Sequence, residues 1–194
     1  MFVSPPPITK AFMLACVGAF CLFILAPQFE PYFMLWPLQS GYFMPWQPIS
    51  YAFLHGGFTH LFFNMLGLYM FGSELERVFG PKRYLNLLLA STLSAAAIQL
   101  IFTMLIGSYS PTLGASGALY GLLLSFGMLF PDRIIVPLIP PIPMKAKYFV
   151  AIFGGLELLL GVSTTQSGIA HFAHLGGMLG AYLMIRYWRN ARRR

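Results

Sequence analysis

Charged residues, and acidic residues above all, are scarce in this sequence. Of 194 residues, five are Asp or Glu, and charged residues make up 9% against 58% that are hydrophobic. Soluble domains of this size carry about 25% charged residues, because their surfaces face water. The scarcity therefore excludes an ordinary soluble protein and predicts an integral membrane protein.

Cysteine and histidine are also few. Cys16 and Cys21 lie in one apolar run, which indicates neither a disulfide framework nor a zinc site. The four histidines lack the cysteines and carboxylates that usually complete a metal or haem site. A small transporter is disfavoured because no inverted repeat and no charged midplane residue is evident. We therefore expect no metal and no cofactor.

What the chain has in abundance is long apolar segments. A spanning helix needs about 20 mostly apolar residues, and six segments approach this length. They lie near 9-27, 57-78, 84-107, 113-130, 147-163 and 168-188. These segments predict an all-α membrane protein, a single six-helix domain over 1-194. The connection 28-56 is rich in aromatic residues and broken by prolines, so we expect it to lie in the interface, against the bundle.

The basic residues all fall on one side of this arrangement. The connections 28-56, 108-112 and 164-167 contain no Lys or Arg, whereas 79-83, 131-146 and the tail are basic. By the positive-inside rule both termini are cytoplasmic. This placement also accounts for the net charge of +7 without nucleic acid as a partner, since the basic residues are not interleaved with aromatic ones on an exposed face.

Ser116 stands among small residues at the head of the fourth segment. A serine there could simply bond back to a backbone carbonyl, as most serines in membrane helices do. Gly117 and Gly121 form a small-xxx-small pair that permits close helix approach, but this leaves the serine unexplained. In the sixth segment, His174 shares a narrow stripe with Gly177 and Ala181, so a close contact between the two segments would bring His174 to Ser116.

Two further polar residues lie on one face of the second segment. His60 and Asn64 are four residues apart, and burying both is costly unless they are used. Helices two, four and six run in the same direction, so His60, Asn64, Ser116 and His174 all lie roughly 3 to 10 Å below the outer surface. His55, by contrast, is expected to bond a neighbouring helix.

These residue types permit nucleophilic catalysis. His174 would accept the proton of Ser116, while His60, Asn64 and the backbone N–H of Ser116 would donate to an oxyanion. Glu157 is the only carboxylate near this depth, and nothing in the sequence connects it with His174. The sequence therefore predicts a Ser–His dyad. Elsewhere, Glu76 and Arg77 are expected to tie the turn between helices two and three.

The chain resembles the rhomboid intramembrane serine proteases of the six-helix bacterial type, and the match runs from Trp46 to Ala181. The family's His-x-x-x-Asn, Gly-x-Ser-Gly and Ala-His-x-x-Gly patterns are met by His60 and Asn64, by Gly114 to Gly117, and by Ala173, His174 and Gly177. His171, one turn before the base, lacks the following glycine. The tryptophan-arginine pair often found in the first loop is Trp46-Gln47 here, and a frequent glycine is Ala181.

The resemblance implies a function and several roles. Ser116 would be the nucleophile and His174 the base, with Tyr120 packing against the histidine ring. Gln99 would retain water for deacylation, with Ser91 a weaker candidate. The substrates would be membrane proteins with a transmembrane helix, cleaved in or next to that helix at a site opening toward the extracytoplasmic side of the cell membrane, the inner membrane in a Gram-negative bacterium. A non-catalytic relative that binds transmembrane helices is the alternative.

Overall fold

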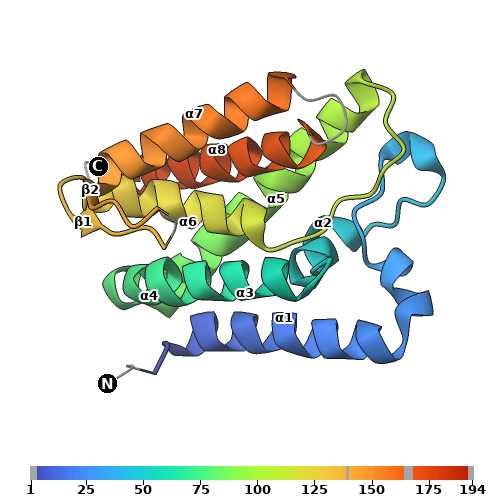
Figure 1. Ribbon diagram of the computed structural model, residues 1–194, viewed down its shortest axis with the longest axis horizontal. Helices are drawn as coiled ribbons and strands as arrows, with labels where there is room; N and C mark the ends of the chain where they lie inside the picture. The colour runs from blue at the N-terminus through green and yellow to red at the C-terminus, as the bar shows by residue number, and fades with distance from the viewer. Residues whose placement is uncertain (1–3, 139, 164–167, 192–194) are drawn as a thin grey trace.

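The computed structural model describes residues 4–138, 140–163 and 168–191, and most of them are helical. The helices lie roughly side by side along the longest axis of the molecule (Figure 1), with α5 crossing obliquely behind the others. The long elements are α1 (Pro7–Leu25), α3 (Phe58–Gly67), α4 (Ser73–Phe79), α5 (Pro81–Leu105), α6 (Ser116–Leu129), α7 (Ala146–Ser163) and α8 (Gly168–Ala191).

A π-helical turn, η4 (Leu68–Gly72), joins α3 to α4 without a break. The described residues therefore form six long helical segments, and the ends of these segments fall within about three residues of the predicted ranges. Among the described residues, α1 and α5 are long and apolar enough to cross a membrane, and α6 is a shorter apolar helix. The prediction of an all-α fold is confirmed, whereas the crossing of a membrane by all six segments stays a prediction.

Helix α8 is the central element of the bundle, because it packs most extensively against α5 and α6 and also contacts α7. Small residues make this packing possible. A Cβ on Gly180 would lie 2.4 Å from the carbonyl oxygen of Ala90 in α5, and one on Gly177 would lie 1.8 Å from that of Gly117 in α6. The backbones of three helices thus meet along one stripe, which holds the first turn of α6 against the middle of α8.

Helix α1 lies at the edge of the bundle and is joined to it by a buried carboxylate. Glu76 in α4 accepts hydrogen bonds from the N–H groups of Ile8 and Thr9 at 2.9 and 2.7 Å and from the Thr9 hydroxyl at 2.8 Å. The negative charge meets the positive end of the α1 dipole. The expectation that Glu76 ties the turn between helices two and three is therefore wrong, because its partners are at the start of α1; Arg77 donates to the Ser4 carbonyl.

The connection between α1 and α3 is folded against the bundle in short helices. It contains η1 (Pro27–Tyr32), η2 (Leu38–Ser40), α2 (Gln47–Ser50) and η3 (Tyr51–Phe53). Gln47 is fully buried, and its side chain accepts from the N–H of Trp36 and donates to the carbonyls of Tyr32 and Tyr42. An uncharged amide therefore organises this loop at the position that follows Trp46.

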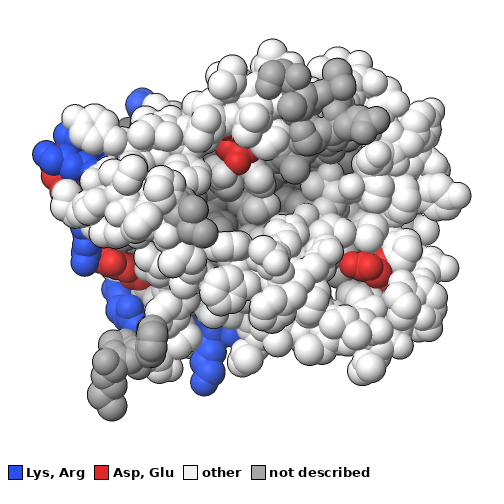
Figure 2. Space-filling model, in the orientation of Figure 1, with Lys and Arg blue, Asp and Glu red and all other residues white. Residues whose placement is uncertain are grey.

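The surface separates charge from apolar side chains. Lys and Arg gather toward one end of the molecule, where α4, the hairpin and the last turns of α8 lie, and the opposite half of the face in Figure 2 carries none. The helices expose many large apolar side chains, including Leu25, Leu105 and Val162, each more than 70% exposed. Exposure of so many apolar side chains is unfavourable in water and favourable in lipid.

A short β-hairpin lies at the end of the molecule where Lys and Arg gather. Strands β1 (Ile134–Ile135) and β2 (Met144–Lys145) pair antiparallel between α6 and α7, an element that the apolar pattern did not predict because each strand has two residues. Asp132 beside it pairs with Lys145 at 3.1 Å and Lys147 at 2.9 Å. Hydrogen bonds from Lys147 and then Lys145 lower the pKa of the Asp132 carboxyl below its ordinary value.

Candidate active site

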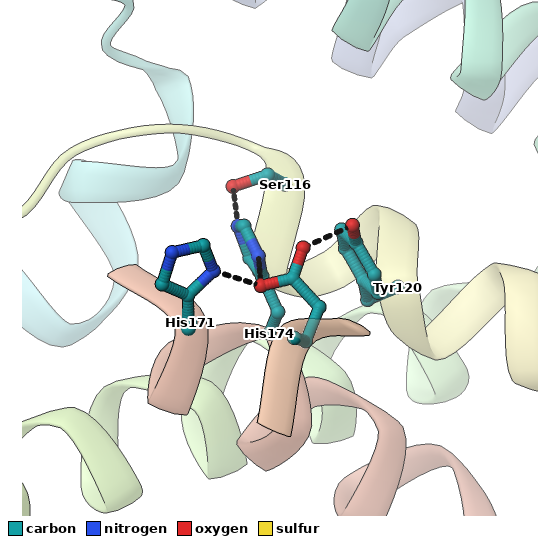
Figure 3. A network of polar contacts seen from close by, with 5 residues as sticks. Ser116, Tyr120, His171 and His174 are labelled. Carbon is teal, nitrogen blue, oxygen red and sulfur yellow. Dashed lines mark hydrogen bonds and ion pairs between the residues drawn. The ribbon is translucent and has the colours of Figure 1, made fainter. Parts of the chain in front are cut away.

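Ser116 and His174 meet at the start of α6 and within the second turn of α8. Ser116 Oγ and His174 Nε2 lie 2.7 Å apart (Figure 3). With the imidazole proton on Nδ1, the serine hydroxyl donates to Nε2, which is the arrangement a general base requires. The structure thus brings together two residues that are 58 positions apart in the chain.

The contact depends on the close approach of α6 and α8. Gly117 follows the serine directly and faces Gly177, one turn after His174 in α8. The missing side chain of Gly177 leaves room for the Gly117 carbonyl, which a Cβ would approach to 1.8 Å. Ala181, the next member of the stripe, is completely buried. Any larger residue along this stripe would separate Ser116 from His174.

Tyr120 lies one turn after the serine and covers one face of the imidazole. Its ring is stacked on that of His174, with centroids 4.3 Å apart and planes 7° from parallel. Its hydroxyl donates a hydrogen bond to Glu157 Oε1. The tyrosine therefore contacts both the imidazole and a carboxylate on the neighbouring helix α7.

Glu157 is the main departure from the sequence prediction. Its oxygen Oε2 lies 2.9 Å from His174 Nδ1, the ring nitrogen that does not face Ser116. The distance is that of an ion pair, although the ring N–H is not aligned for a hydrogen bond. The structure thus shows a contact that the sequence did not indicate, because the rotation of α7 about its axis turns this carboxylate toward His174.

His171 contacts the same carboxylate oxygen of Glu157 as His174 does. Its Nδ1 contacts Glu157 Oε2, and its ring meets that of His174 edge to face at a centroid distance of 6.3 Å. The two histidines are three residues apart on α8, so both project toward α7. Glu157 therefore has polar neighbours on two helices and is only 8% exposed.

Glu157, His171 and His174 also form the only group of three candidate metal ligands among the described residues. Their ligand atoms lie within 4.8 Å of one another. Two ligands of one tetrahedral zinc ion, however, stand about 3.3 Å apart, and the carboxylate here is closer than that to both imidazoles. As arranged, these side chains bond each other, and the group would have to open before it could hold a cation.

His60 lies beside the serine at the start of α3. A Cβ on Gly114 would lie 2.9 Å from His60 Cε1 and 3.5 Å from Ser116 Oγ, so the imidazole and the hydroxyl border the same glycine. Gly114 also has φ of +130°, a backbone conformation that side chains rarely adopt. Glycine is thus required here both by conformation and by space.

Asn64 is oriented by its own helix. Its Nδ2 donates to the His60 carbonyl at 2.8 Å, and its Oδ1 is buried without a hydrogen-bond partner in the part of the chain that the structure describes. One N–H of the amide stays available, because Nδ2 carries two. Asn64 and His60 therefore share a face, as predicted, but no contact joins the Asn64 amide to Ser116.

The backbone offers further donors at the same point. Helix α6 begins at Ser116, and its N-cap residue Ala115 makes no side-chain capping bond. The first N–H groups of a helix have no intrahelical acceptor, and the helix dipole places partial positive charge there. The N–H of Ser116 can therefore donate to an anion next to the hydroxyl.

Gln99 in α5 is buried, and half of its amide is unused. Its Nε2 donates to Thr112 Oγ1 at 2.8 Å, whereas Oε1 has no partner among the described residues. Thr112 belongs to the segment leading into α6, and its backbone bridges to Leu35 in the long loop. The lone buried acceptor fits a bound water. The hydroxyl of Ser91 is also buried and has no hydrogen-bond partner in the described part of the chain; it packs deeper, against Gly121.

Tyr51 is a supporting residue that the sequence analysis missed. It is 1% exposed, its hydroxyl donates to the Thr92 carbonyl at 3.0 Å, and its own carbonyl accepts from the N–H of Gly114 at 2.9 Å. This tyrosine fixes the strained glycine that precedes the serine. In the sequence, Tyr51 is one of several aromatic residues in this loop, and nothing distinguishes it from a residue that anchors the loop at the membrane interface.

His55 lies in the same loop, outside the long helices. Its Nδ1 is 3.3 Å from the Phe53 carbonyl, and its ring meets that of His60 at a centroid distance of 5.1 Å. The expected bond to a neighbouring helix is therefore wrong, since the partner belongs to its own loop. Burial, and next the proximity of His60, lower the pKa of His55 to about 4, so the ring is neutral at pH 7.

A family model and several known proteins similar to this chain all belong to one family. The rhomboid domain family matches residues 42–190 of the chain. Rhomboid protein 1, mitochondrial, of Saccharomyces cerevisiae is 34% identical over 134 residues, or 68% of this chain and 38% of the yeast protein. Rhomboid protease GlpG of Yersinia pestis is 27% identical over 184 residues, or 94% of this chain and 62% of that protein.

A third relative, rhomboid protease GluP of Bacillus subtilis, is 30% identical over 142 residues, which is 71% of this chain and 25% of the relative. The chain thus spans between a quarter and about two thirds of the length of these three relatives. The family match covers more than half of the chain, including every residue of the Ser116 site described above. The chain therefore belongs to the rhomboid family.

Proposed function

We propose that this protein is an intramembrane serine endopeptidase that cleaves other membrane proteins in or next to a transmembrane helix. The observation that carries the proposal is the 2.7 Å contact between Ser116 Oγ and His174 Nε2 at the meeting point of α6 and α8. The names of the relatives as rhomboid proteases support the same reaction class. A relative that only binds helices would have no need of this serine and base pair.

In the first half of the proposed reaction, Ser116 Oγ attacks the carbonyl carbon of the substrate while His174 Nε2 takes its proton. The carbonyl oxygen becomes an oxyanion. Donors for it are the N–H of Ser116 at the head of α6, the imidazole of His60 and the free N–H of Asn64. Tyr120 keeps the imidazole in plane by stacking on it.

In the second half, the C–N bond breaks and His174 returns the proton to the leaving amine, so an acyl-serine remains. Water then attacks this ester with His174 again as base, releasing the acid product and restoring the hydroxyl. Gln99 is proposed to hold that water, since its buried Oε1 needs a donor. The reaction as proposed uses no metal and no cofactor.

We further propose that all six helical segments cross the membrane with both termini in the cytoplasm. The gathering of Lys and Arg at one end of the molecule supports this orientation. Ser116, at the beginning of α6, would then open toward the extracytoplasmic side of the cell membrane, which is the inner membrane in a Gram-negative bacterium. The bilayer and membrane-protein substrates are the expected partners, and nucleic acid is not.

The test is labelling of the detergent-purified protein with a fluorophosphonate, which reacts with activated serines and requires no knowledge of the substrate. Wild type should be labelled, and Ser116→Ala and His174→Ala should not. Ser125→Ala is the matched control, because Ser125 lies on the same helix but donates to the Gly121 carbonyl. A folded wild-type protein that stays unlabelled, or labelling that persists in Ser116→Ala, would overturn the proposal and favour a helix-binding relative.

A further inference from the structure

Glu157 gives His174 a negatively charged neighbour that a Ser–His dyad does not include. The carboxylate reaches the imidazole from α7, whereas the serine reaches it from α6. The two contacts are on different nitrogens, Nδ1 at 2.9 Å from Glu157 and Nε2 at 2.7 Å from Ser116. The His174 imidazole therefore contacts the Ser116 hydroxyl through one ring nitrogen and the Glu157 carboxylate through the other.

The carboxylate is also held in place. Tyr120 donates its hydroxyl to Oε1, and His171 contacts Oε2, so each oxygen has a partner other than His174. A buried carboxylate that is bonded on both oxygens keeps its charge and its orientation. Tyr120 contacts both the base and the carboxylate, because its ring stacks on that of His174 and its hydroxyl donates to Glu157.

We propose that Glu157 is a positioning residue of this site, which stabilises His174 as an imidazolium while Ser116 attacks, so that the reaction uses a Ser–His–Glu arrangement. This inference rests on the proposed function. The proton that leaves Ser116 makes His174 positive, and the carboxylate 2.9 Å away offsets that charge without taking the proton. Because the ring N–H is not aligned with Oε2, the interaction is electrostatic more than directional.

Other titratable groups lie near His174 and could also influence the pH dependence of labelling. His171 precedes it on α8, Tyr120 faces it from α6, and His60 on α3 is near enough for charge interaction. A Glu157 variant leaves all three residues unsubstituted, although Tyr120 and His171 lose their contact with a charged carboxylate. A difference between wild type and variant in the pH at which the base loses function therefore reports on the carboxylate.

The experiment measures the second-order rate constant of fluorophosphonate labelling from about pH 5 to 9 for wild type, Glu157→Gln and Glu157→Asp. In labelling, the Ser116 Oγ–P bond forms, the P–F bond breaks, fluoride leaves and the serine proton passes to His174. Glu157→Gln should lower the rate constant about 10- to 100-fold. It should also move the acid limb of the profile about one unit to lower pH, because protonated His174 is no longer stabilised.

Two further variants keep the result interpretable. Glu157→Asp retains the charge on a shorter side chain, so its acid limb should stay near that of wild type even if the rate falls. Glu74→Gln is the matched control, since this carboxylate pairs with Arg133 on the surface at the basic end, and it should change neither the rate nor the profile. Thermal unfolding of each variant shows whether a loss of labelling is due to misfolding. If Glu157→Gln does not fold, the pH profile of Glu157→Asp decides whether the charge matters.

The outcomes separate the two proposals. A folded wild type that is not labelled overturns the serine protease function, and this inference with it. A labelled wild type, together with a Glu157→Gln protein of unchanged rate, overturns the inference alone. A lower rate with an unmoved acid limb does the same, because a merely structural carboxylate would affect packing and not the charge balance at His174. A lower rate with a displaced limb supports it.

Discussion

Replacing Gly177 by alanine should separate the two helices that carry the serine and the histidine. The added Cβ would lie 1.8 Å from the Gly117 carbonyl oxygen and 2.7 Å from its carbon, both parts of a helix backbone that cannot swing aside. A comfortable carbon–oxygen contact is about 3.3 Å, so α6 and α8 must move apart by about 1.5 Å. The Ser116–His174 distance of 2.7 Å would then exceed hydrogen-bond length.

The expected cost is large for activity and moderate for stability. A misplacement of about 1 Å in a catalytic pair lowers the rate about 100-fold, and overpacking costs about 1–3 kcal/mol of unfolding free energy. Fluorophosphonate labelling and thermal unfolding in detergent measure the two effects. Gly18→Ala in α1 is the matched control, because nothing lies within 4 Å of its new Cβ. Labelling of Gly177→Ala at more than half the wild-type rate would refute the reasoning about helix approach.

Three other predictions concern stability, pH and metals. Glu76→Gln should lower the unfolding free energy by about 2 kcal/mol in a denaturation experiment, since the α1 N-terminus loses a buried anionic acceptor. Glu74→Gln, at a partly exposed carboxylate paired with Arg133, should cost little; equal effects would contradict this. Because the folded-state pKa of His55 is about 4, below its unfolded value, stability should be full above pH 6.5 and fall by about 2 kcal/mol toward pH 4, and His55→Gln should flatten that dependence. A chelator such as EDTA should leave labelling of Ser116 unchanged; inactivation that zinc reverses would point instead to a cation at Glu157.

The helical framework could be predicted because lipid imposes a simple rule. Each spanning helix needs a long apolar run, so the positions of the long helices follow from hydropathy and fall close to those of the structure. The loop before α3 could not be predicted in the same way. Its folding depends on particular long-range bonds, such as those of Gln47 to three backbone groups and the bridge between Leu35 and Thr112. Single residues of this kind leave no periodic pattern.

The meeting of Ser116 and His174 could be predicted because glycines and a shared depth mark it in the sequence. The contribution of α7 could not. Depth along a helix follows from counting residues, but the direction of a side chain around the axis depends on how the helix packs, and 100° separates one residue from the next. Glu157 was therefore placed near the right depth with no means of knowing that it faces His174 instead of lipid.

That inward orientation has an energetic reason that the structure makes visible. In the proposed membrane topology, a carboxylate turned toward lipid from α7 would cost several kcal/mol, which favours the rotation that gives Glu157 polar partners. His171 and Tyr120 would suffice for that purpose, since together they contact both oxygens. The additional approach of Oε2 to His174 Nδ1 is therefore not required to bury the charge. A contact that packing does not need, made to the ring nitrogen that does not face the serine, is best explained by the charge that His174 would acquire on accepting the serine proton in the proposed reaction.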